Sequence, residues 1–522
     1  MSQQPRFTRR GVIGVAAAGA ITATIAGLGG WRVRQRPILD DRDAAQGSTS
    51  RTPLLIPPLA PSTTDGDGAR VFSLTAGAGS TQFLPDRATP TWGYNGAFGG
   101  PTLRARTGDR VRVSVTNDLD ETTTTHWHGM KLPAKADGGP HQPIRPGETW
   151  TAEWVVEQPA ATLWYHPHNH GTTEAHVYRG LAGMFVIDDA ESGTEQDPLP
   201  HEYGVDDVPV IIGDRAFLAD GSFDEEHRSA AGMLGDTILV NGTVSPRFEA
   251  TRAETRLRVL NASAARTYRL QLEGGSLLLV GTDAGLVPEP AWVGAVTLTP
   301  GERVEVIVQL EPGETAMLRS LPHTLGLLGS TERASGTKDH LDILELTRPA
   351  DSTGEPEFEA KLAALGGALA AAFPVDQEPD ERRTVTMQDS KINHRRMNMG
   401  RIDEVVTVES RERWFITNEH FLAHNLHIHN ARFLIHSIGG APPVVELQGW
   451  KDTVYAPPSR TVIVDVEFGT ATDPNLPYMF HCHMLQHEDA GMMAQFVVVN
   501  PGEAAGPIIS PATENGGDHD GH

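Results

Sequence analysis

The 522-residue chain has a single cysteine, Cys482, so it cannot form an intrachain disulfide. In an oxidising compartment its stability would therefore depend on packing and on bound metals. Positive charge is also scarce, since 43 Lys and Arg stand against 67 Asp and Glu and the net charge is −24. Because this charge repels phosphates, nucleic acid is excluded as a partner, whereas neutral and cationic substrates are permitted.

The N-terminus predicts export. Arg9 and Arg10 precede an apolar, Gly- and Ala-rich run that continues to about Trp31, a pattern typical of a twin-arginine signal over residues 1–36. An uncut membrane anchor is the alternative, because about 20 apolar residues can span a bilayer. The twin-arginine export machinery is thus an expected partner, with a periplasmic, cell-surface or secreted location and membrane anchoring as a further option.

The lone cysteine lies among metal-binding residue types. His481 and His483 flank Cys482, and on an extended chain their side chains point away from the face that carries the thiol. His487 and Met492 follow five and ten residues after the cysteine. A thiolate with imidazoles and a distant thioether suits blue copper, which needs a second imidazole from elsewhere. A lone cysteine is otherwise a small core residue.

The chain also contains four His-x-His pairs, which are hard to explain as core or surface histidines. Imidazole is the commonest transition-metal ligand, so the pairs predict metal sites. They are His126 and His128, His166 and His168, His427 and His429, and His481 and His483.

Three runs with strand-like alternation, 109–115, 254–260 and 412–417, precede Asn117, Asn261 and Asn418 and predict three copies of one β unit. The length agrees with three domains of roughly 150 residues. The predicted order is a signal or anchor (1–36), a linker (37–69), domain 1 (70–195), domain 2 (205–348), a connection with a short Ala-rich helix (349–383), domain 3 (384–502) and a disordered tail (503–522).

Counting from these asparagines shows which copies carry ligands. The positions nine and eleven residues after the first and third asparagines hold the two pairs that begin with His126 and His427. The same positions in the middle copy hold Leu270 and Leu272. Domain 2 is therefore predicted to be a spacer. Domain 1 has Pro167 where domain 3 has Cys482, so only domain 3 can build the thiolate site.

The four motifs, their order and the threefold repeat resemble the three-domain multicopper oxidases, the family of laccases, bilirubin oxidases and bacterial copper-efflux oxidases. The resemblance covers about residues 71–500. It implies an all-β fold of three cupredoxin-like β-sandwich domains and four copper ions per chain. It also implies that four one-electron oxidations of a reductant are coupled to the reduction of O2 to two waters.

Carried over by position, the resemblance implies four copper sites. The type 1 copper would take Cys482, His424 and His487 with Met492 as a weak axial ligand, and the type 2 copper His126 and His427. One type 3 copper would take His128, His166 and His483, and the other His168, His429 and His481.

Two carboxylates are candidate catalytic residues, because forming water requires protons beside the cluster. Asp137, nine residues after His128, and Glu488, next to His487, resemble the acids of the family. The alternatives are a turn aspartate before two glycines for Asp137 and a hydrogen-bond partner of a ligand for Glu488.

The expected reductant is a phenol, an aryl amine or a bilirubin-like compound, because the connection is alanine-rich where copper-efflux relatives carry a methionine-rich insert. Oxidation of cuprous or other metal ions is the alternative. A copper-free scaffold, like the cell-division relatives of the family, is disfavoured because Cys482 and all the predicted ligand histidines are present. A two-domain nitrite reductase is disfavoured because both ligand-bearing domains lie in one chain.

Overall fold

The computed structural model describes residues 38–40, 51–229, 231–364, 366–374 and 378–509. The predicted signal or anchor over residues 1–36 and the tail from residue 510 onward therefore lie outside the described residues. Within the described ranges, no helix is both long and apolar enough to cross a membrane.

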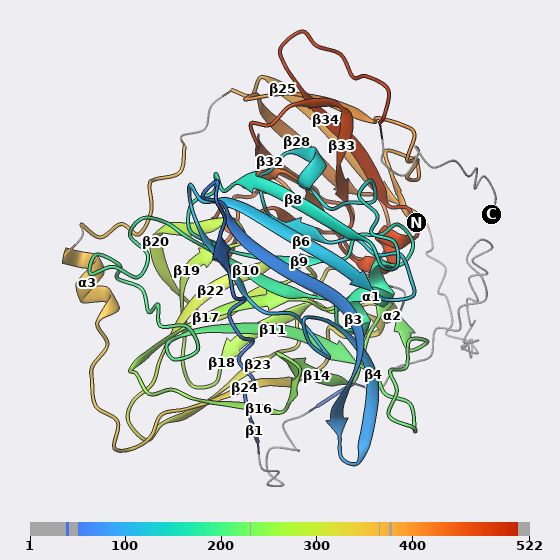
Figure 1. Cartoon of the computed structure of the whole chain (residues 1–522). Coiled ribbons are helices and arrows are strands. Elements are labelled where there is room, and N and C mark those ends of the chain that lie inside the picture. Colours follow the sequence, from blue (N-terminus) through green and yellow to red (C-terminus); the bar gives the residue numbers. More distant parts are fainter. Residues whose placement is uncertain (1–37, 41–50, 230, 365, 375–377, 510–522) are drawn as a thin grey trace, which may run out of the picture. The chain divides into compact units, whose positions relative to one another are not determined.

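The three alternating runs are strands with the same neighbours in each copy (Figure 1). They are β6 (Arg110–Asp118), β17 (Glu254–Asn261) and β28 (Arg411–Asn418). Each lies between a parallel and an antiparallel partner. For β6 these are β3 (Arg70–Leu84) and β8 (Thr149–Val155), and for β17 they are β11 (Asp207–Arg215) and β22 (Arg303–Gln309). For β28 they are β25 (Glu381–Gln388) and β32 (Thr461–Phe468). The predicted threefold repeat is confirmed.

The asparagine that ends each run is buried and makes the same hydrogen bonds in all three copies. Its side-chain amide donates to two backbone carbonyls, and its Oδ1 accepts from the N–H two residues later. A buried amide must be paired in this way to avoid a desolvation cost. The asparagine thus holds the turn that leads into the next strand.

The middle turn has one extra residue. In the first copy, Asn117 binds the carbonyl of Ile144, and Ile144 pairs with Thr123, six positions after the asparagine. In the third copy, Asn418 binds the carbonyl of Ala456, and Ala456 pairs with His424, again six positions after the asparagine. In the middle copy the equivalent residue is Tyr268, seven positions after Asn261, which pairs with Leu298.

The positions in domain 2 that match the first His-x-His pair are therefore Gln271 and Glu273. The prediction of Leu270 and Leu272 is wrong by one residue, because a fixed offset misses an insertion in a turn. Neither Gln271 nor Glu273 is an imidazole, so the middle copy still lacks this pair.

Each domain contains two large sheets. In domain 1 they are β2 (Thr63–Thr64), β3, β6 and β8, with β4 (Arg87–Tyr94) on β3, and β5 (Leu103–Arg106), β10 (Gly183–Asp188), β9 (Ala161–His166) and β7 (His126–His128). In domain 3 they are β26 (Lys391–Ile392), β25, β28, β32 and β30 (Ala431–Ile438), and β27 (Glu404–Thr407), β34 (Met493–Val499), β33 (Asp473–His481), β29 (His424–Ile428) and β31 (Thr453–Ala456).

Domain 2 has a six-stranded and a seven-stranded sheet. The first runs β1 (Thr52–Pro53), β16 (Pro246–Glu249), β24 (Leu341–Thr347), β23 (Thr315–Ser320), β18 (Tyr268–Leu272) and β21 (Val296–Leu298). The second runs β15 (Thr243–Val244), β14 (Thr237–Val240), β11, β17, β22, β19 (Leu277–Thr282) and β20 (Gly285–Val293). A small hairpin joins β12 (Arg228–Ser229) and β13 (Gly232–Met233).

The helices are short. They are α1 (Thr173–Arg179), α2 (Ser330–Ala334), α3 (Phe358–Ala364) and α4 (Leu485–Asp489), with 3-10 turns η2 (Ala134–Ala136) and η3 (Val445–Leu447). The helix expected in the Ala-rich connection is α3.

The described residues of the predicted linker are attached to the sheets. β1 pairs with β16 of domain 2, and β2 pairs with β3 of domain 1. At the other end, Gly506 and Ile509 in the predicted tail donate backbone hydrogen bonds to Pro474 and Asn475.

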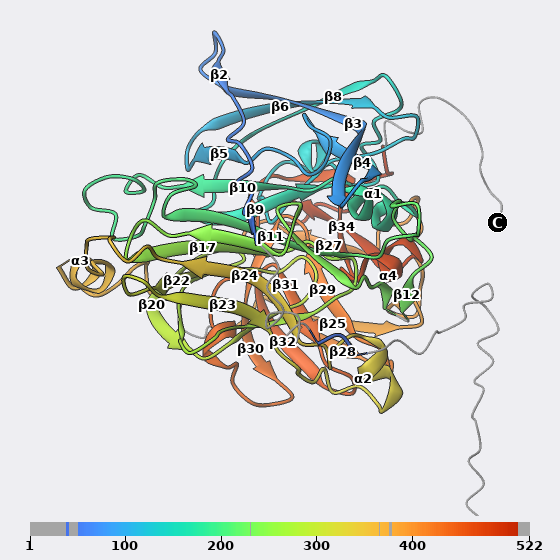
Figure 2. The ribbon, with the colours of Figure 1, turned by 90° about the horizontal axis from the view of Figure 1, so that it is seen from below.

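One hydrophobic core spans domains 1 and 3. It includes Phe72 and Trp127 from domain 1 and Trp414 and Val498 from domain 3, whereas domain 2 has a core of its own. The Tyr478 hydroxyl crosses this interface and donates to the Leu132 carbonyl at 2.7 Å. Strands β9 and β10 contact β22 and β11 of domain 2 on another side (Figure 2). The first and last domains therefore face each other, as the predicted shared cluster requires.

Candidate metal centre

All the predicted ligands except Met492 fall into groups of three whose donor atoms lie within 4.8 Å of one another, and every member is buried. The groups are His126, His128 and His427; His128, His166 and His483; His168, His429 and His481; and His424, Cys482 and His487. The structure thus brings together the residues that the sequence motifs singled out.

Strand register places these side chains. The pairing of β7 with β9 puts His126 opposite His166, and the pairing of β29 with β33 puts His427 opposite His481. Because side chains alternate along a strand, His126 and His128 share a face while Trp127 points into the core, where its ring lies 5.5 Å from that of Trp154.

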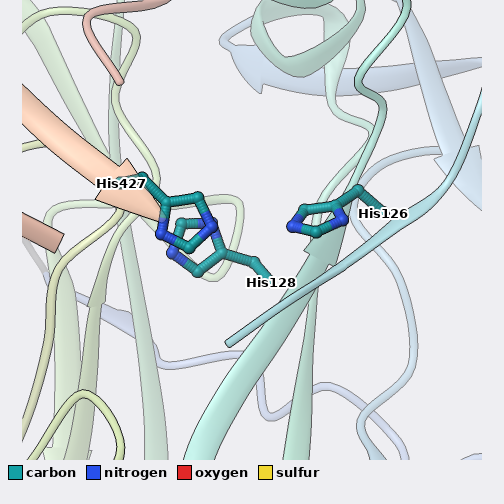
Figure 3. A group of neighbouring side chains, drawn as sticks. All are labelled: His126, His128 and His427. Atoms are coloured by element: carbon teal, nitrogen blue, oxygen red, sulfur yellow. The ribbon is translucent and has the colours of Figure 1, made fainter. Parts of the chain in front are cut away.

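The imidazoles of domains 1 and 3 interleave. The ring of His128 stacks on His427 at 3.6 Å between centroids, and His126 lies across from this pair (Figure 3). His126 in turn stacks on His429 at 3.8 Å. Each domain therefore supplies half of one centre, related by an approximate twofold arrangement.

Backbone carbonyls fix the protonation of several imidazoles. A carbonyl only accepts, so the Nδ1 facing it carries the proton and Nε2 keeps a free lone pair. This is the case for His126, His166 and His427, whose Nδ1 atoms lie 2.8, 2.7 and 2.9 Å from the carbonyls of Asp137, Pro167 and Asp452. Their buried Nε2 atoms have no hydrogen-bond partner, as expected of metal ligands.

The other imidazoles also turn free nitrogens toward one another. The Nε2 of His481 lies 3.1 Å from that of His168 and 3.2 Å from that of His429. Burial, followed by neighbouring histidines, holds the pKa of His168 and His429 well below the usual range, so these rings stay neutral. Nδ1 of His128 and both nitrogens of His483 are buried without partners.

The thiol site has the donor set that suits copper. The Cys482 Sγ lies 3.6 and 3.7 Å from the Nδ1 atoms of His424 and His487, which are 3.1 Å apart. Backbone hydrogen bonds tie the buried Met492 to Cys482 and His487. Burial raises the pKa of Cys482 to about 12, so metal binding would have to displace its proton. A soft thiolate with imidazoles fits copper better than oxygen-preferring ions.

Asp137 and Glu488 both touch predicted ligands. The Asp137 carboxylate accepts from Nδ1 of His429 at 2.8 Å, and burial raises the pKa of Asp137 well above its ordinary value. The two Glu488 oxygens lie 3.3 and 3.2 Å from Nδ1 of His168 and His481. The Asp137 side chain thus contacts a predicted ligand in addition to its place before a turn, and both acids lie within 3.3 Å of predicted ligand imidazoles.

Asp452 is a third carboxylate at this centre, which the motifs did not reveal. Its backbone carbonyl accepts from His427, and its Oδ1 lies 3.1 Å from Nε2 of His128. Asp137 makes the matching contacts, with its carbonyl to His126 and its carboxylate to His429. The sequence motifs missed it because Asp452 lies 23 residues after His429, and β30 and η3 come between them in the chain.

Arg303 of domain 2 pairs with Asp452. Two guanidinium nitrogens reach its carboxylate oxygens at 2.7 and 2.6 Å, and both side chains are fully buried. Burial alone would raise the pKa of Asp452, but Arg303 and His128 hold it well below its usual range.

Domain 2 also orients the thiol site. Asn425 donates to the Thr299 hydroxyl at 3.0 Å and to the Pro300 carbonyl at 2.8 Å, while its Oδ1 accepts from the His483 N–H at 2.9 Å. Within the described residues domain 2 supplies no member of the ligand groups, as predicted, but it also positions residues that contact them.

Removing Arg303 should destabilise the protein strongly. We expect Arg303→Met to lower the free energy of unfolding of the copper-free protein by roughly 3–5 kcal/mol, because Asp452 would remain as an unpaired buried charge. Denaturant unfolding measures the loss. The matched control is Arg110→Met at the exposed pair with Glu153, which should cost under about 1 kcal/mol. Equal losses in the two variants would contradict a structural role for the Arg303 pair.

The histidines outside the predicted ligand spacings join none of the ligand groups within the described residues; they include His141, His170, His176 and His436. His141 faces Gln495, and His176 faces Thr123 at the position where domain 3 has His424. Trp164 stacks on His166 at 4.1 Å between centroids, which agrees with a packing role beside a ligand.

Comparisons with known proteins agree with this geometry. Two family models, both described as multicopper oxidase, match residues 76–192 and 372–502. The multicopper oxidase mco of Staphylococcus haemolyticus is 33% identical over 470 residues, which span 88% of this chain and 96% of the relative. The cell division protein FtsP of Yersinia pestis is 34% identical over 459 residues, spanning 87% and 94%.

A solved structure supports the predicted fold. The laccase-like multi-copper oxidase CueO from Ochrobactrum sp. is 33% identical with a TM-score of 0.74, and the match covers 86% of this chain and all of that one. The predicted all-β fold of cupredoxin-like β-sandwiches is thereby confirmed. The chain belongs to the multicopper oxidase family, and this membership implies an oxidoreductase that uses copper, O2 and a reductant.

Proposed function

We propose that this protein is a laccase-like oxidase that couples four one-electron oxidations of a phenol or aryl amine to the reduction of O2 to water. The observation that carries the proposal is the complete set of buried, convergent donors, one thiol site beside three imidazole groups. Copper bound there, four ions per chain in this proposal, would supply the one-electron chemistry and the site of O2 reduction.

The chain itself links the two kinds of site. Cys482 belongs to the thiol group, while its neighbours His481 and His483 belong to two different imidazole groups. A covalent path of one residue therefore joins reductant oxidation to O2 reduction. Asp137 and Glu488, in contact with His429, His168 and His481, would deliver the protons that water formation consumes.

His420 marks the place where a reductant would meet the thiol site. His424 is 1% exposed, and its Nε2 is approached at 3.3 Å by Nδ1 of His420, whose ring lies nearly parallel at 20°. Phe421, which is 49% exposed, lies against the imidazole of His420. An aromatic reductant can stack on the rings of His420 and Phe421 without entering the core.

Metal-ion oxidation is a second candidate, supported by one contact. The other ring nitrogen of His420 lies 3.3 Å from the exposed carboxylate of Asp389, so an imidazole and a carboxylate could hold a cation at the same edge. A copper-free scaffold role, suggested by likeness to the cell-division relatives, would leave eleven buried donors without purpose.

The proposal also includes export by the twin-arginine machinery, with residues 1–36 as signal or anchor.

A substrate comparison tests the proposal. Copper-loaded protein should oxidise a dimethoxyphenol with higher kcat/KM than ferrous or cuprous ion, and bilirubin should be tested beside them. His420→Phe keeps an aromatic surface but loses the nitrogens, so it should impair metal-ion oxidation more than phenol oxidation. Faster turnover of a metal ion than of any phenol would favour the second candidate. Protein that binds copper yet oxidises none of these compounds would contradict an oxidase.

A further inference from the structure

A cavity of about 360 Å³ lies between the N-terminal segment and domains 1 and 2. This volume is within the range of small-molecule sites. Its wall is mainly apolar and includes Leu55, Leu59, Phe98, Val177, Ile211 and Leu239, and none of the predicted copper ligands.

Arg215, at the end of β11, is a buried guanidinium in this wall. It is 4% exposed, and it donates to the carbonyls of Asp214 and Val177 at 2.8 and 3.1 Å. Its Nε has no hydrogen-bond partner, and no carboxylate of the described chain forms an ion pair with it. Burying a cation without an anion is costly, so the site is electrostatically incomplete.

Other arginines of domain 2 show what a complete arrangement looks like. Arg258 and Arg266, equally buried, each pair with two carboxylates, and these raise the pKa of both groups despite burial. Burial instead lowers the pKa of Arg215 below its ordinary value. An anionic ligand would complete Arg215 as the acids complete its neighbours.

The guanidinium is held in a defined position. Its carbon lies 4.6 Å from the centre of the Tyr178 ring and 5.8 Å from that of Phe98. Gly213, which also lines the cavity, leaves room for it, since a Cβ there would lie 3.0 Å from Nη1. These contacts hold the guanidinium in place beside the cavity, so it is pre-organised for a ligand.

The remaining polar side chains of the wall have partners of their own. Asn241 makes three hydrogen bonds, Asn95 makes two, and the Tyr94 hydroxyl pairs with Thr125. Arg215 is thus the polar side chain of this wall whose hydrogen bonding is incomplete within the described chain, and its positive charge beside an apolar cavity favours a ligand with one negative charge.

The mouth of the cavity is apolar and exposed. Leu55 and Leu59 are 57% and 43% exposed, although both lie on a segment fixed by hydrogen bonds. Leu55 donates its N–H to the Thr243 hydroxyl, and its carbonyl accepts from Asn241 at 2.9 Å. Leucines held rigidly in water at a cavity mouth indicate a surface that a ligand covers.

We propose that this cavity binds an amphipathic monoanion, with a carboxylate at Arg215 and a medium-length apolar chain running past Phe98 to Leu55 and Leu59. The site is separate from the proposed oxidase chemistry and does not depend on it. Because the chain as a whole carries a net charge of −24, non-specific attraction does not favour such a ligand, and its selection rests on Arg215.

Calorimetric titration of copper-loaded protein tests the site. The probe is decanoate below its micellar concentration, with decanol as the uncharged counterpart. Decanoate should bind with a one-to-one stoichiometry and more tightly than decanol. Arg215→Met should weaken decanoate about tenfold or more and leave decanol unchanged. No saturable binding, or equal affinity for decanoate in both proteins, would overturn the proposal.

A surface variant guards against misfolding of the arginine variant. Leu55→Glu places a like charge at the mouth, where the side chain is already exposed, and should weaken decanoate several-fold, whereas Leu55→Gln should not. If the two Leu55 variants bind decanoate equally, the ligand does not enter by this mouth and the site is misplaced. The midpoint of thermal unfolding should be the same in both variants, which shows that the protein is intact.

Discussion

Replacing Cys482 with serine should abolish both the blue absorption expected of the proposed copper–thiolate site and the turnover of phenols. The intense band of such a site arises from charge transfer between a thiolate and copper, and the chain has no second cysteine to replace Sγ. A hydroxyl remains protonated and is a harder donor, so the two imidazoles of His424 and His487 would be left without the sulfur and should bind the ion too weakly to retain it. The loss is seen in the visible spectrum and in steady-state phenol oxidation.

The rest of the centre should survive this change. Serine fits the space of cysteine, and Oδ1 of Asn425, 3.8 Å from Sγ, offers its hydroxyl an acceptor. The imidazole groups should therefore still take up copper, measured by elemental analysis as about three of the four ions proposed for the unaltered chain. Met492→Leu is the control, because a weak axial ligand can be lost while the blue band remains. A serine variant that stays blue and active would refute the assignment of the thiol site.

Asp137→Asn should slow the reoxidation of the reduced protein by O2 by about 100-fold or more, the usual contribution of a positioned acid–base group. The amide oxygen can still accept from His429, and the backbone carbonyl that orients His126 is unchanged. What is lost is the ability to hold and release a proton. Stopped-flow mixing of the anaerobically reduced protein with O2 measures the rate.

Reduction of the thiol site by substrate should be unaffected in the same variant, since Asp137 does not touch Cys482 or its imidazoles. Asp118→Asn, on an exposed position at the end of β6, is the control and should behave like the unaltered protein. Unchanged reoxidation in Asp137→Asn would mean that Asp137 only supports the ring of His429.

The features that could be predicted from sequence are those in which the residues involved are close together in the chain. A His-x-His pair on a strand fixes two ligands on one face, and Cys482 between two histidines fixes the link between sites. Asp137 could be found because it follows its pair by nine residues within one loop.

What escaped prediction depends on insertions and on distant segments. Asp452 plays the same part as Asp137, but a hairpin strand separates it from His429. Arg303 comes from a domain without ligands, and nothing in its own motif indicates a partner 149 residues away. The extra residue in the turn after Asn261 shifted the predicted register by one, because spacing alone does not distinguish turn lengths.

The common core of domains 1 and 3 constrains how the protein is made. Apolar side chains near residue 72 are sealed by others near residue 498, so the first third of a growing polypeptide has no finished interior while the ribosome is still translating the middle. Each of the three all-histidine groups takes members from both domains, so none of them is complete until domain 3 has been synthesised. Prematurely terminated products would expose this unsealed surface, which makes them targets for chaperones and proteases rather than sources of half-active enzyme.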